Sequence, residues 1–324
     1  MDQLIQAMKA AGEPTRMRLL LVLNRSELTV SELCRILGQS QPRVSRHLKL
    51  LCDAGLLVRQ AEGTSAYYRH ARSPFADRFL ADLLDLTEGD HEAVARDRQE
   101  LASVRAARAE LAARSFEKVA QEADLLAEHR VPVADVEAAM LAAVGDLEIN
   151  RLLDVGTGTG RVLELFAPRI QAGMGLELSR EMLNLARTQL DAADLNHCSV
   201  RYGNAYNLDV PVGSVSLAVL HHVLHFLDEP GRAIAQAARA VEASGRLIIV
   251  DFGPHHIEEL RTDHGHRRLG FSEEEVHQWC LAADLLEVDC THLELPTDPP
   301  GLTISMWVAT QRPDAPKVPN LEVA

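Results

Sequence analysis

Apolar residues in the first seventy positions recur every three or four residues, the spacing of short amphipathic helices. With Gly38 as a stop, Ser40 as an N-cap and Pro42 in a first turn, the pattern predicts four helices, over 3–12, 14–24, 29–37 and 40–54. Two strand-like runs follow, 56–60 and 65–70, joined by a Glu-Gly-Thr turn that is typical of a hairpin. This order predicts a winged helix-turn-helix over residues 1–73.

The next stretch, 74–145, is rich in Ala, Leu, Glu and Arg and is almost continuously helical in its pattern up to about residue 128. Its apolar positions fall on one helix face, and the only internal break signal is Gly89-Asp90. A further amphipathic helix is expected over 132–144. The segment is either a plain structural linker or a dimerisation element.

From Arg151 onward, apolar runs alternate with helical stretches. The runs are 152–155, 172–178, 199–202, 216–220, 246–252, 286–291 and 305–310. Such alternation predicts an α/β fold with a mostly parallel, doubly wound sheet, here over 146–312, and helices between the first five runs. The last two runs follow each other directly, which favours an antiparallel pair at one edge. The proline-rich end, 313–324, is expected to be a disordered tail.

Composition adds a globular class and a charge asymmetry. Apolar residues make up 47% and charged residues 25% of the chain, with no apolar run long enough for a membrane helix and no signal-peptide pattern, so a cytoplasmic protein is expected. The net charge of −14 argues against nucleic acid, yet residues 1–72 carry 11 Lys and Arg against 6 Asp and Glu. A basic N-terminal segment followed by an acidic remainder indicates two functions on one chain.

The five cysteines form no CxxC pair and are odd in number. We interpret them as reduced thiols in mostly packed positions, with no disulfide framework. No metal site is assigned to them, and a site formed by scattered residues for a metal or metalloid stays open.

A glycine-rich turn carries the most specific chemistry. Asp154-x-Gly156-x-Gly158-x-Gly160 follows an apolar strand and opens a helix, and Glu177 ends the next strand 21 residues after Gly156. The dinucleotide pattern GxGxxG would need glycine where Arg161 stands, and a carboxylate beside the turn disfavours a pyrophosphate. The pattern resembles class I S-adenosylmethionine methyltransferases over about half of the chain.

The resemblance implies a bound S-adenosylmethionine or S-adenosylhomocysteine. Residues at the corresponding positions are Asp154, Gly156, Thr157, Gly158, Gly160, Glu177, Leu178, Met182, Asn204, Ala205 and His221. Many relatives have Asp where Asn204 stands.

Methyl transfer depends mainly on positioning, and a base matters only for a hydroxyl or amine acceptor. Candidate catalytic residues are His221, His222, His225, His264 and His266. Since successive strand residues point to opposite sides, His221 and His222 are expected to diverge. His264 and His266, beside Asp263, could bind metal, act as acid and base, or form a polar lid.

The fourth expected helix has the layout of a DNA-recognition helix. Val44, Leu48 and Leu51 are spaced to pack inward, which leaves its polar residues for DNA. Over residues 3–72 the sequence resembles the ArsR/SmtB family, at Ser31-Glu32-Leu33-Cys34, at 39–48 (QSQPRVSRHL) and at Gly55-Leu56-Leu57.

This resemblance implies a dimeric repressor on a palindromic double-stranded DNA operator, and it favours the dimerisation reading of 74–145. DNA-contacting positions would be Gln39, Ser40, Gln41, Arg43, Ser45, Arg46, His47, Lys49, Arg59, Tyr67 and Arg69. The metal-binding cysteines of arsenic-sensing members fall on Thr29 and Ser31, and only Cys34 remains. The family's other metal site consists of acids and histidines on the helix after the wing. Its candidates in this sequence are Asp77, Asp82, Asp90 and His91.

Two functions stay open. One is a homodimeric transcription regulator whose DNA binding is linked to cofactor or small-molecule binding. The other is an active methyltransferase of a small molecule or metalloid, arsenic included, that regulates its own gene. A DNA or protein methyltransferase lacks a recognisable catalytic motif, and no membrane partner is expected.

Overall fold

A computed structural model describes the chain except residues 25, 63–64, 72, 88–91, 128–130, 295–301 and 316–324, and it leaves the side chains of 112–127 undescribed. The chain divides into two compact units, one formed mainly by Met1–Ala112 and one mainly by residues 113–320. The expected hairpin turn at Gly63, the helix break at Gly89-Asp90, His91 and most of the expected tail lie outside the described residues.

The N-terminal unit has the helices and three-stranded sheet of a winged helix. Its elements are α1 (Asp2–Ala11), α2 (Pro14–Leu23), β1 (Leu28–Thr29), α3 (Val30–Leu37), α4 (Gln41–Asp53), β2 (Leu57–Glu62) and β3 (Ser65–His70), with sheet order β1-β3-β2. Thr29 and Glu32 form a capping box at the start of α3, and Gly38 ends that helix at a φ of 64° that favours glycine. Val44, Leu48 and Leu51 are fully buried, as expected from the spacing.

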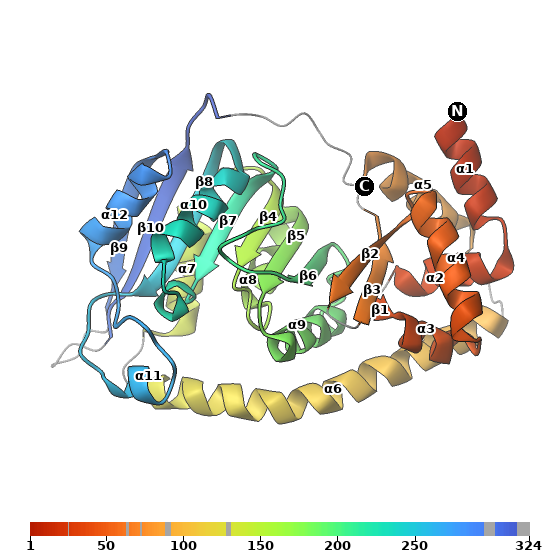
Figure 1. The fold of residues 1–324 in the computed structure, drawn as a ribbon, viewed down its shortest axis with the longest axis horizontal. Helices are drawn as coiled ribbons and strands as arrows, with labels where there is room; N and C mark the ends of the chain where they lie inside the picture. The colour runs from red at the N-terminus through yellow and green to blue at the C-terminus, as the bar shows by residue number, and fades with distance from the viewer. Residues whose placement is uncertain are drawn as a thin grey trace. The chain divides into compact units, whose positions relative to one another are not determined.

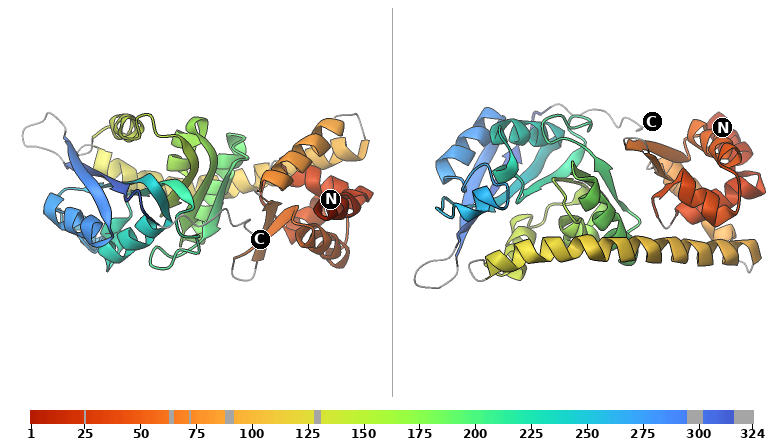
Figure 2. Two further views of the ribbon diagram at one scale, coloured as in Figure 1. Left: turned by 90° about the horizontal axis from the view of Figure 1, so that it is seen from above. Right: turned by 60° about the horizontal axis from the view of Figure 1, so that its bottom comes forward.

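Two further helices follow, and the second belongs to this unit up to Ala112. They are α5 (Pro74–Leu86), capped by Ser73, and α6 (Glu92–Ala127), a single unbroken helix in the views of Figures 1 and 2. Leu101 and Val104 of α6 are buried in the winged-helix core. Two arginine–carboxylate pairs add to this packing: Arg18 donates to Asp97 in two hydrogen bonds of 2.6 Å, and Arg108 donates to Glu32 at 2.7 and 2.8 Å.

The C-terminal unit is built on a seven-stranded sheet of order β6-β5-β4-β7-β8-β10-β9 (Figure 1). The strands are β4 (Ile149–Val155), β5 (Ile170–Glu177), β6 (Cys198–Tyr202), β7 (Val215–His221), β8 (Val241–Phe252), β9 (Leu285–Leu293) and β10 (Ile304–Gln311). Pairs among β4 to β8 are parallel, whereas β10 pairs antiparallel with both β8 and β9. The expected parallel sheet and antiparallel edge pair are therefore confirmed.

The helices of this unit are α7 (Val133–Ala143), α8 (Arg161–Phe166), α9 (Arg180–Ala192), α10 (Pro230–Ala240), α11 (Glu259–Thr262) and α12 (Glu273–Ala282), with 3-10 turns η1 (Ala167–Arg169) and η2 (Leu224–Phe226). Of these, α7, α8, α10 and α12 pack against strands of the sheet. Alternate strand residues such as Leu153, Ala218 and Ile249 share one core with Ile234 of α10 and Val276 of α12. This alternation is what a sheet with buried faces requires.

One expectation for this unit is wrong. No helix joins β6 to β7, because the twelve residues between them turn through an Asn204–Asn207 bridge and carry Pro211 and Gly213, which do not favour a helix. Within the described residues, no helix has the length and apolar character needed to cross a membrane.

Candidate active site

The expected cofactor residues gather at one edge of the sheet, where its parallel strands end. The register pairs Val155 with Leu176 and Leu220, and His221 with Val250, so β4, β5, β7 and β8 end side by side. In doubly wound sheets, ligands bind at the carboxyl ends of the strands. The fold thus brings the glycine turn, the acid after β5 and the histidines after β7 to the same edge.

The glycine turn is held tightly against β5. Gly156 and Thr157 both donate backbone hydrogen bonds to the Leu176 carbonyl, at 2.7 and 3.0 Å. Gly156, Gly158 and Gly160 have φ values of 74°, 52° and 85°, which favour glycine. A Cβ on Gly156 would lie 2.4 Å from the Val223 side chain, so the loop after β7 packs directly on this turn.

Asp154 is the most unusual group of the turn. Its side chain is 1% exposed, and Thr157 donates to its Oδ2 at 2.5 Å, while Oδ1 has no hydrogen-bond partner among the described residues. Burial, and to a lesser extent the nearby Glu177, raises the pKa of this carboxyl to about 7. A cation at Oδ1 would compensate the buried charge, whereas a phosphate would not.

Glu177 lies at the end of β5 with its carboxylate fixed by the backbone. Its Oε1 accepts from the N–H groups of Leu178 and Ser179, both at 2.8 Å, and its Oε2 accepts from Gly158 at 3.1 Å. A carboxylate has about four acceptor positions, so one remains on Oε2 for a ligand hydroxyl. This arrangement fits a ribose beside the glycine turn.

The other expected cofactor residues border the same edge. Met182 is half-buried in the first turn of α9, Leu178 is 56% exposed, and Ala205 is half-buried after β6. Asn204 is exposed, and its Oδ1 accepts from the Tyr206 N–H at 2.9 Å, which fixes the side chain in a turn.

A buried His225–Asp251 pair lies after β7 and β8. His225 Nδ1 donates to Asp251 Oδ1 at 2.7 Å, and the two side chains are 3% and 0% exposed. Asp251 also accepts backbone N–H groups from Leu224 and His225 at Oδ2 and from Phe252 at Oδ1. With Nδ1 as donor to a carboxylate, the His225 ring presents Nε2 as its basic atom.

Asp251 was missed by the sequence analysis. The signal was a charged residue closing an otherwise apolar strand, Ile248-Ile249-Val250-Asp251, at the edge where ligands bind.

Further imidazoles lie near this pair, and one sequence expectation about them is wrong. The rings of His221 and His222 do not diverge; their centroids lie 4.6 Å apart. Strand alternation ends at His221, and His222 has a φ of 52°, which turns its side chain back. His266 stacks on His225 with centroids 4.1 Å apart.

The other histidines of this region differ in burial. His266 is 5% exposed, and its Nδ1 has no partner among the described residues. Burial, together with the neighbouring His225, lowers the pKa of His266 to about 3, so this ring stays neutral. His264 is half-buried and Asp263 exposed, and neither is grouped with His266 as metal ligands in the described chain.

The expected DNA-contacting residues mostly lie on the solvent side of α4. Gln41, Arg43, Arg46 and Lys49 are exposed, as are Ser40 and, on β2, Arg59, whereas Ser45 is half-buried. His47 is half-buried, with its Nδ1 3.5 Å from Glu13 Oε2. Burial, as the largest cause, lowers the pKa of His47.

Two expected contact residues are held by neighbours, and a third is half-buried. Gln39 donates to Thr15 Oγ1 at 3.3 Å, and Arg69 lies 3.5 Å from Glu27. Tyr67 is half-buried on β3.

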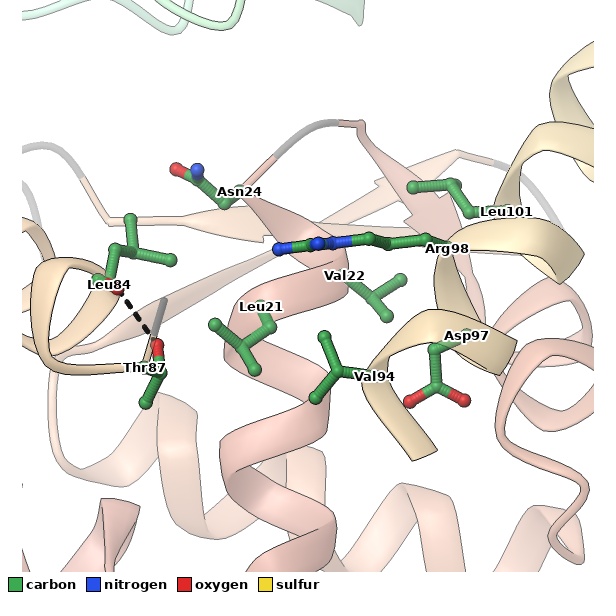
Figure 3. A pocket seen from close by; sticks show the side chains of 9 residues that line it. All are labelled: Leu21, Val22, Asn24, Leu84, Thr87, Val94, Asp97, Arg98 and Leu101. Carbon is green, nitrogen blue, oxygen red and sulfur yellow. Dashed lines mark hydrogen bonds between the residues drawn. The ribbon is translucent and has the colours of Figure 1, made fainter. Parts of the chain in front are cut away.

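A cavity of about 100 Å³ opens between α2, α5 and α6 (Figure 3). It is lined by Leu21, Val22, Asn24, Leu84, Thr87, Val94, Asp97, Arg98 and Leu101. No sequence pattern predicted it, because it exists only where three helices meet.

Comparison with known proteins assigns both halves of the chain. Residues 13–58 match the family model described as "Bacterial regulatory protein, arsR family", and residues 153–249 match that of a "Methyltransferase domain". The chain is 40% identical over 82 residues to the arsenical resistance operon repressor of Escherichia coli (strain K12), covering 25% of this chain and 68% of the repressor.

The methyltransferase half has more distant relatives. It is 26% identical over 102 residues to the uncharacterized methyltransferase YcgJ of Bacillus subtilis (strain 168), covering 32% of this chain and only 40% of that protein. The crystal structure of YcgJ superimposes with a TM-score of 0.49 and 18% identity, over 54% of this chain and 97% of that one. From its match to the arsenical resistance repressor, the chain belongs to the arsR family of bacterial regulatory proteins, and from the second family match it carries a methyltransferase domain on the same polypeptide.

Proposed function

We propose that the C-terminal unit binds S-adenosylmethionine at the glycine turn and methylates a small molecule, and that the N-terminal unit binds operator DNA as a homodimer. The observation that carries the cofactor assignment is the buried Asp154 carboxylate with its partnerless Oδ1. A sulfonium nucleoside with an amino group satisfies such a site, and a dinucleotide pyrophosphate does not.

Each residue of the turn has a defined part in this proposal. Asp154 would face the positive charge, Glu177 would accept a ribose hydroxyl at its remaining position, and the glycines leave room for close approach. When bound, the cofactor supplies an electrophilic methyl group. The enzyme then needs to hold the acceptor in line and to remove its proton.

The His225–Asp251 pair is suited to remove that proton. The Nδ1 proton of His225 points to Asp251, so Nε2 would accept the proton of an acceptor hydroxyl or amine. Asp251 also stabilises the imidazolium that forms. A metalloid acceptor is less well supported, because Cys198, Cys280 and Cys290 lie on three separate elements, β6, α12 and β9.

Calorimetry on the full-length protein tests the cofactor site. S-adenosylmethionine and S-adenosylhomocysteine should bind, NAD⁺ should not, and Glu177→Gln should weaken binding at least tenfold. Glu181→Gln, an exposed residue in the first turn of α9, is the matched control. Equal binding of NAD⁺, or unchanged affinity in Glu177→Gln, contradicts the assignment.

DNA binding linked to the cofactor is the regulatory part of the proposal. The arsenic-sensing cysteine positions are Thr29 and Ser31, and the same chain carries a separate ligand site, so that site is the natural sensor. A ligand shifts DNA affinity only if it binds the DNA-competent and DNA-free states differently. Because operator DNA lies in the cytoplasm, we expect the protein to act there.

This linkage predicts that operator affinity changes when either cofactor form is saturating. Fluorescence anisotropy on a palindromic site selected from random DNA measures it. Glu177→Gln should keep operator binding but lose the cofactor response. An operator affinity that is unchanged by both cofactor forms would contradict the sensing proposal. Size-exclusion chromatography with light scattering tests whether the protein is a dimer.

A further inference from the structure

A group of side chains of the kinds that bind metal ions lies on the β9–α12 surface, on elements that contribute no residue to the site above. Glu273 is the first residue of α12, and Cys290 and His292 stand on β9 two positions apart, so their side chains share one face of the strand. One ligand atom from each lies within 4.8 Å of the others. A carboxylate, a thiol and an imidazole from α12 and β9 therefore lie close together.

The imidazole of His292 is oriented for ligation. Its Nδ1 lies 2.9 Å from Oγ of Ser305, a residue of the neighbouring strand β10 that is 0% exposed. Its Nε2 lies 3.4 Å from Glu273 Oε2. A second partner on the far ring nitrogen is the usual device that fixes a metal-binding histidine, because it sets both the tautomer and the direction of the ring.

We propose that Glu273, Cys290 and His292 bind a divalent transition-metal ion of the zinc class. A set of one sulfur, one nitrogen and one oxygen ligand suits Zn²⁺ or Co²⁺, with water completing a tetrahedron. Magnesium and calcium prefer oxygen ligands alone, which excludes them here. The site needs no electron transfer: the Cys290 thiol releases its proton to solvent as the Sγ–metal bond forms.

Bound metal would join the start of α12 to β9. Because α12 follows the loop that carries His255 and His266, the ion would also fix one end of that loop.

Cobalt titration of the full-length, reduced protein tests the proposal. Co²⁺ bound through Cys290 gives a thiolate-to-cobalt charge-transfer band in the near ultraviolet, which histidine-only binding does not give. We expect one equivalent of this band in the wild type, its loss in Cys290→Ser, and at least tenfold weaker binding in His292→Ala. Zinc should displace the cobalt and raise the melting temperature of the wild type but not of Cys290→Ser.

Cys34→Ser is the matched control, since Cys34 is the single thiol left at the family's own metal position. Loss of the band in this variant would place the metal in the N-terminal unit and overturn the proposal, as would a titration without the band. Glu273→Gln tests a ligand whose replacement should not affect folding, because the Glu273 side chain is 61% exposed. It should fold normally and bind cobalt more weakly, and wild-type affinity there would exclude Glu273 as a ligand.

Discussion

The buried Asp154 carboxylate allows a prediction whose sign and size follow from the structure. In the cofactor-free protein its pKa is raised from 3.8 to about 7, chiefly by burial. Between these values the native state holds a proton that the unfolded state has released, so this group lowers the free energy of unfolding as pH rises from about 4 to about 7. Full ionisation therefore costs about 4 kcal/mol, at 1.36 kcal/mol for each pKa unit.

Asp154→Asn removes this ionisation and keeps an acceptor for the Thr157 hydroxyl. The amide nitrogen at the other position stays without a partner, which costs about 2 kcal/mol. The cofactor-free variant should thus be about 2 kcal/mol more stable than the wild type near pH 8. The free energy of unfolding of the variant, relative to that of the wild type, should fall by about 3 kcal/mol between pH 8 and pH 5, because the wild-type carboxyl takes up its proton over this range.

Urea unfolding followed by tryptophan fluorescence measures this effect in the relevant unit. Both tryptophans, Trp279 and Trp307, belong to the C-terminal unit, so the signal reports its unfolding alone. Asp289→Asn, at an exposed position of β9, is the control and should show no such trend. A stability difference between Asp154→Asn and wild type that is the same at pH 5 and pH 8 would refute the reasoning.

Saturating S-adenosylmethionine should have the opposite effect and stabilise the wild type more than Asp154→Asn, because the positive charge of the cofactor pairs with the Asp154 carboxylate.

Three further predictions concern packing, an ion pair and DNA. In Gly175→Ala the new Cβ would lie 2.6–2.7 Å from side-chain atoms of Thr157. We expect the free energy of unfolding in urea to fall by about 1–3 kcal/mol and cofactor binding in calorimetry to weaken, and normal binding would contradict this. Asp97→Ala removes two 2.6 Å hydrogen bonds from the partly exposed Arg18 guanidinium. Circular dichroism melting should show the N-terminal unit destabilised by about 1–3 kcal/mol, and an unchanged melt would contradict this. Arg46→Ala removes an exposed charge of α4 and should weaken operator binding by about 1–3 kcal/mol in anisotropy, with no effect on cofactor affinity.

Local sequence signals determined most of the fold. Helix stops such as Gly38, and apolar spacing such as Val44-Leu48-Leu51, act over one or two turns, so a reader of the sequence sees all of their partners. The expected cap residue Ser40 stands at the start of α4, but its side chain makes no capping hydrogen bond there. The same holds for the glycine turn, since the steric need for glycine at positive φ is a property of the residue itself. The sheet and both family resemblances followed from these short-range patterns.

The long-range contacts were decided only by the tertiary structure. Asp251 and His225 are 26 residues apart, and their hydrogen bond exists because β7 and β8 are parallel neighbours that end together. Glu273 and His292 meet for a similar reason, through the packing of α12 on β9. Side-chain direction also failed as a local rule at His222, where the strand had already ended.

At Asp154 too, one part of the site follows from the sequence and another only from the tertiary structure. The sequence placed a carboxylate beside a glycine turn, which already argued against a phosphate ligand. Only folding excludes water from that carboxylate, and the energy of a buried charge depends on every group packed around it. The sequence therefore determined which chemical groups stand at this edge, while the tertiary structure decided how far each is from water and which partner it faces.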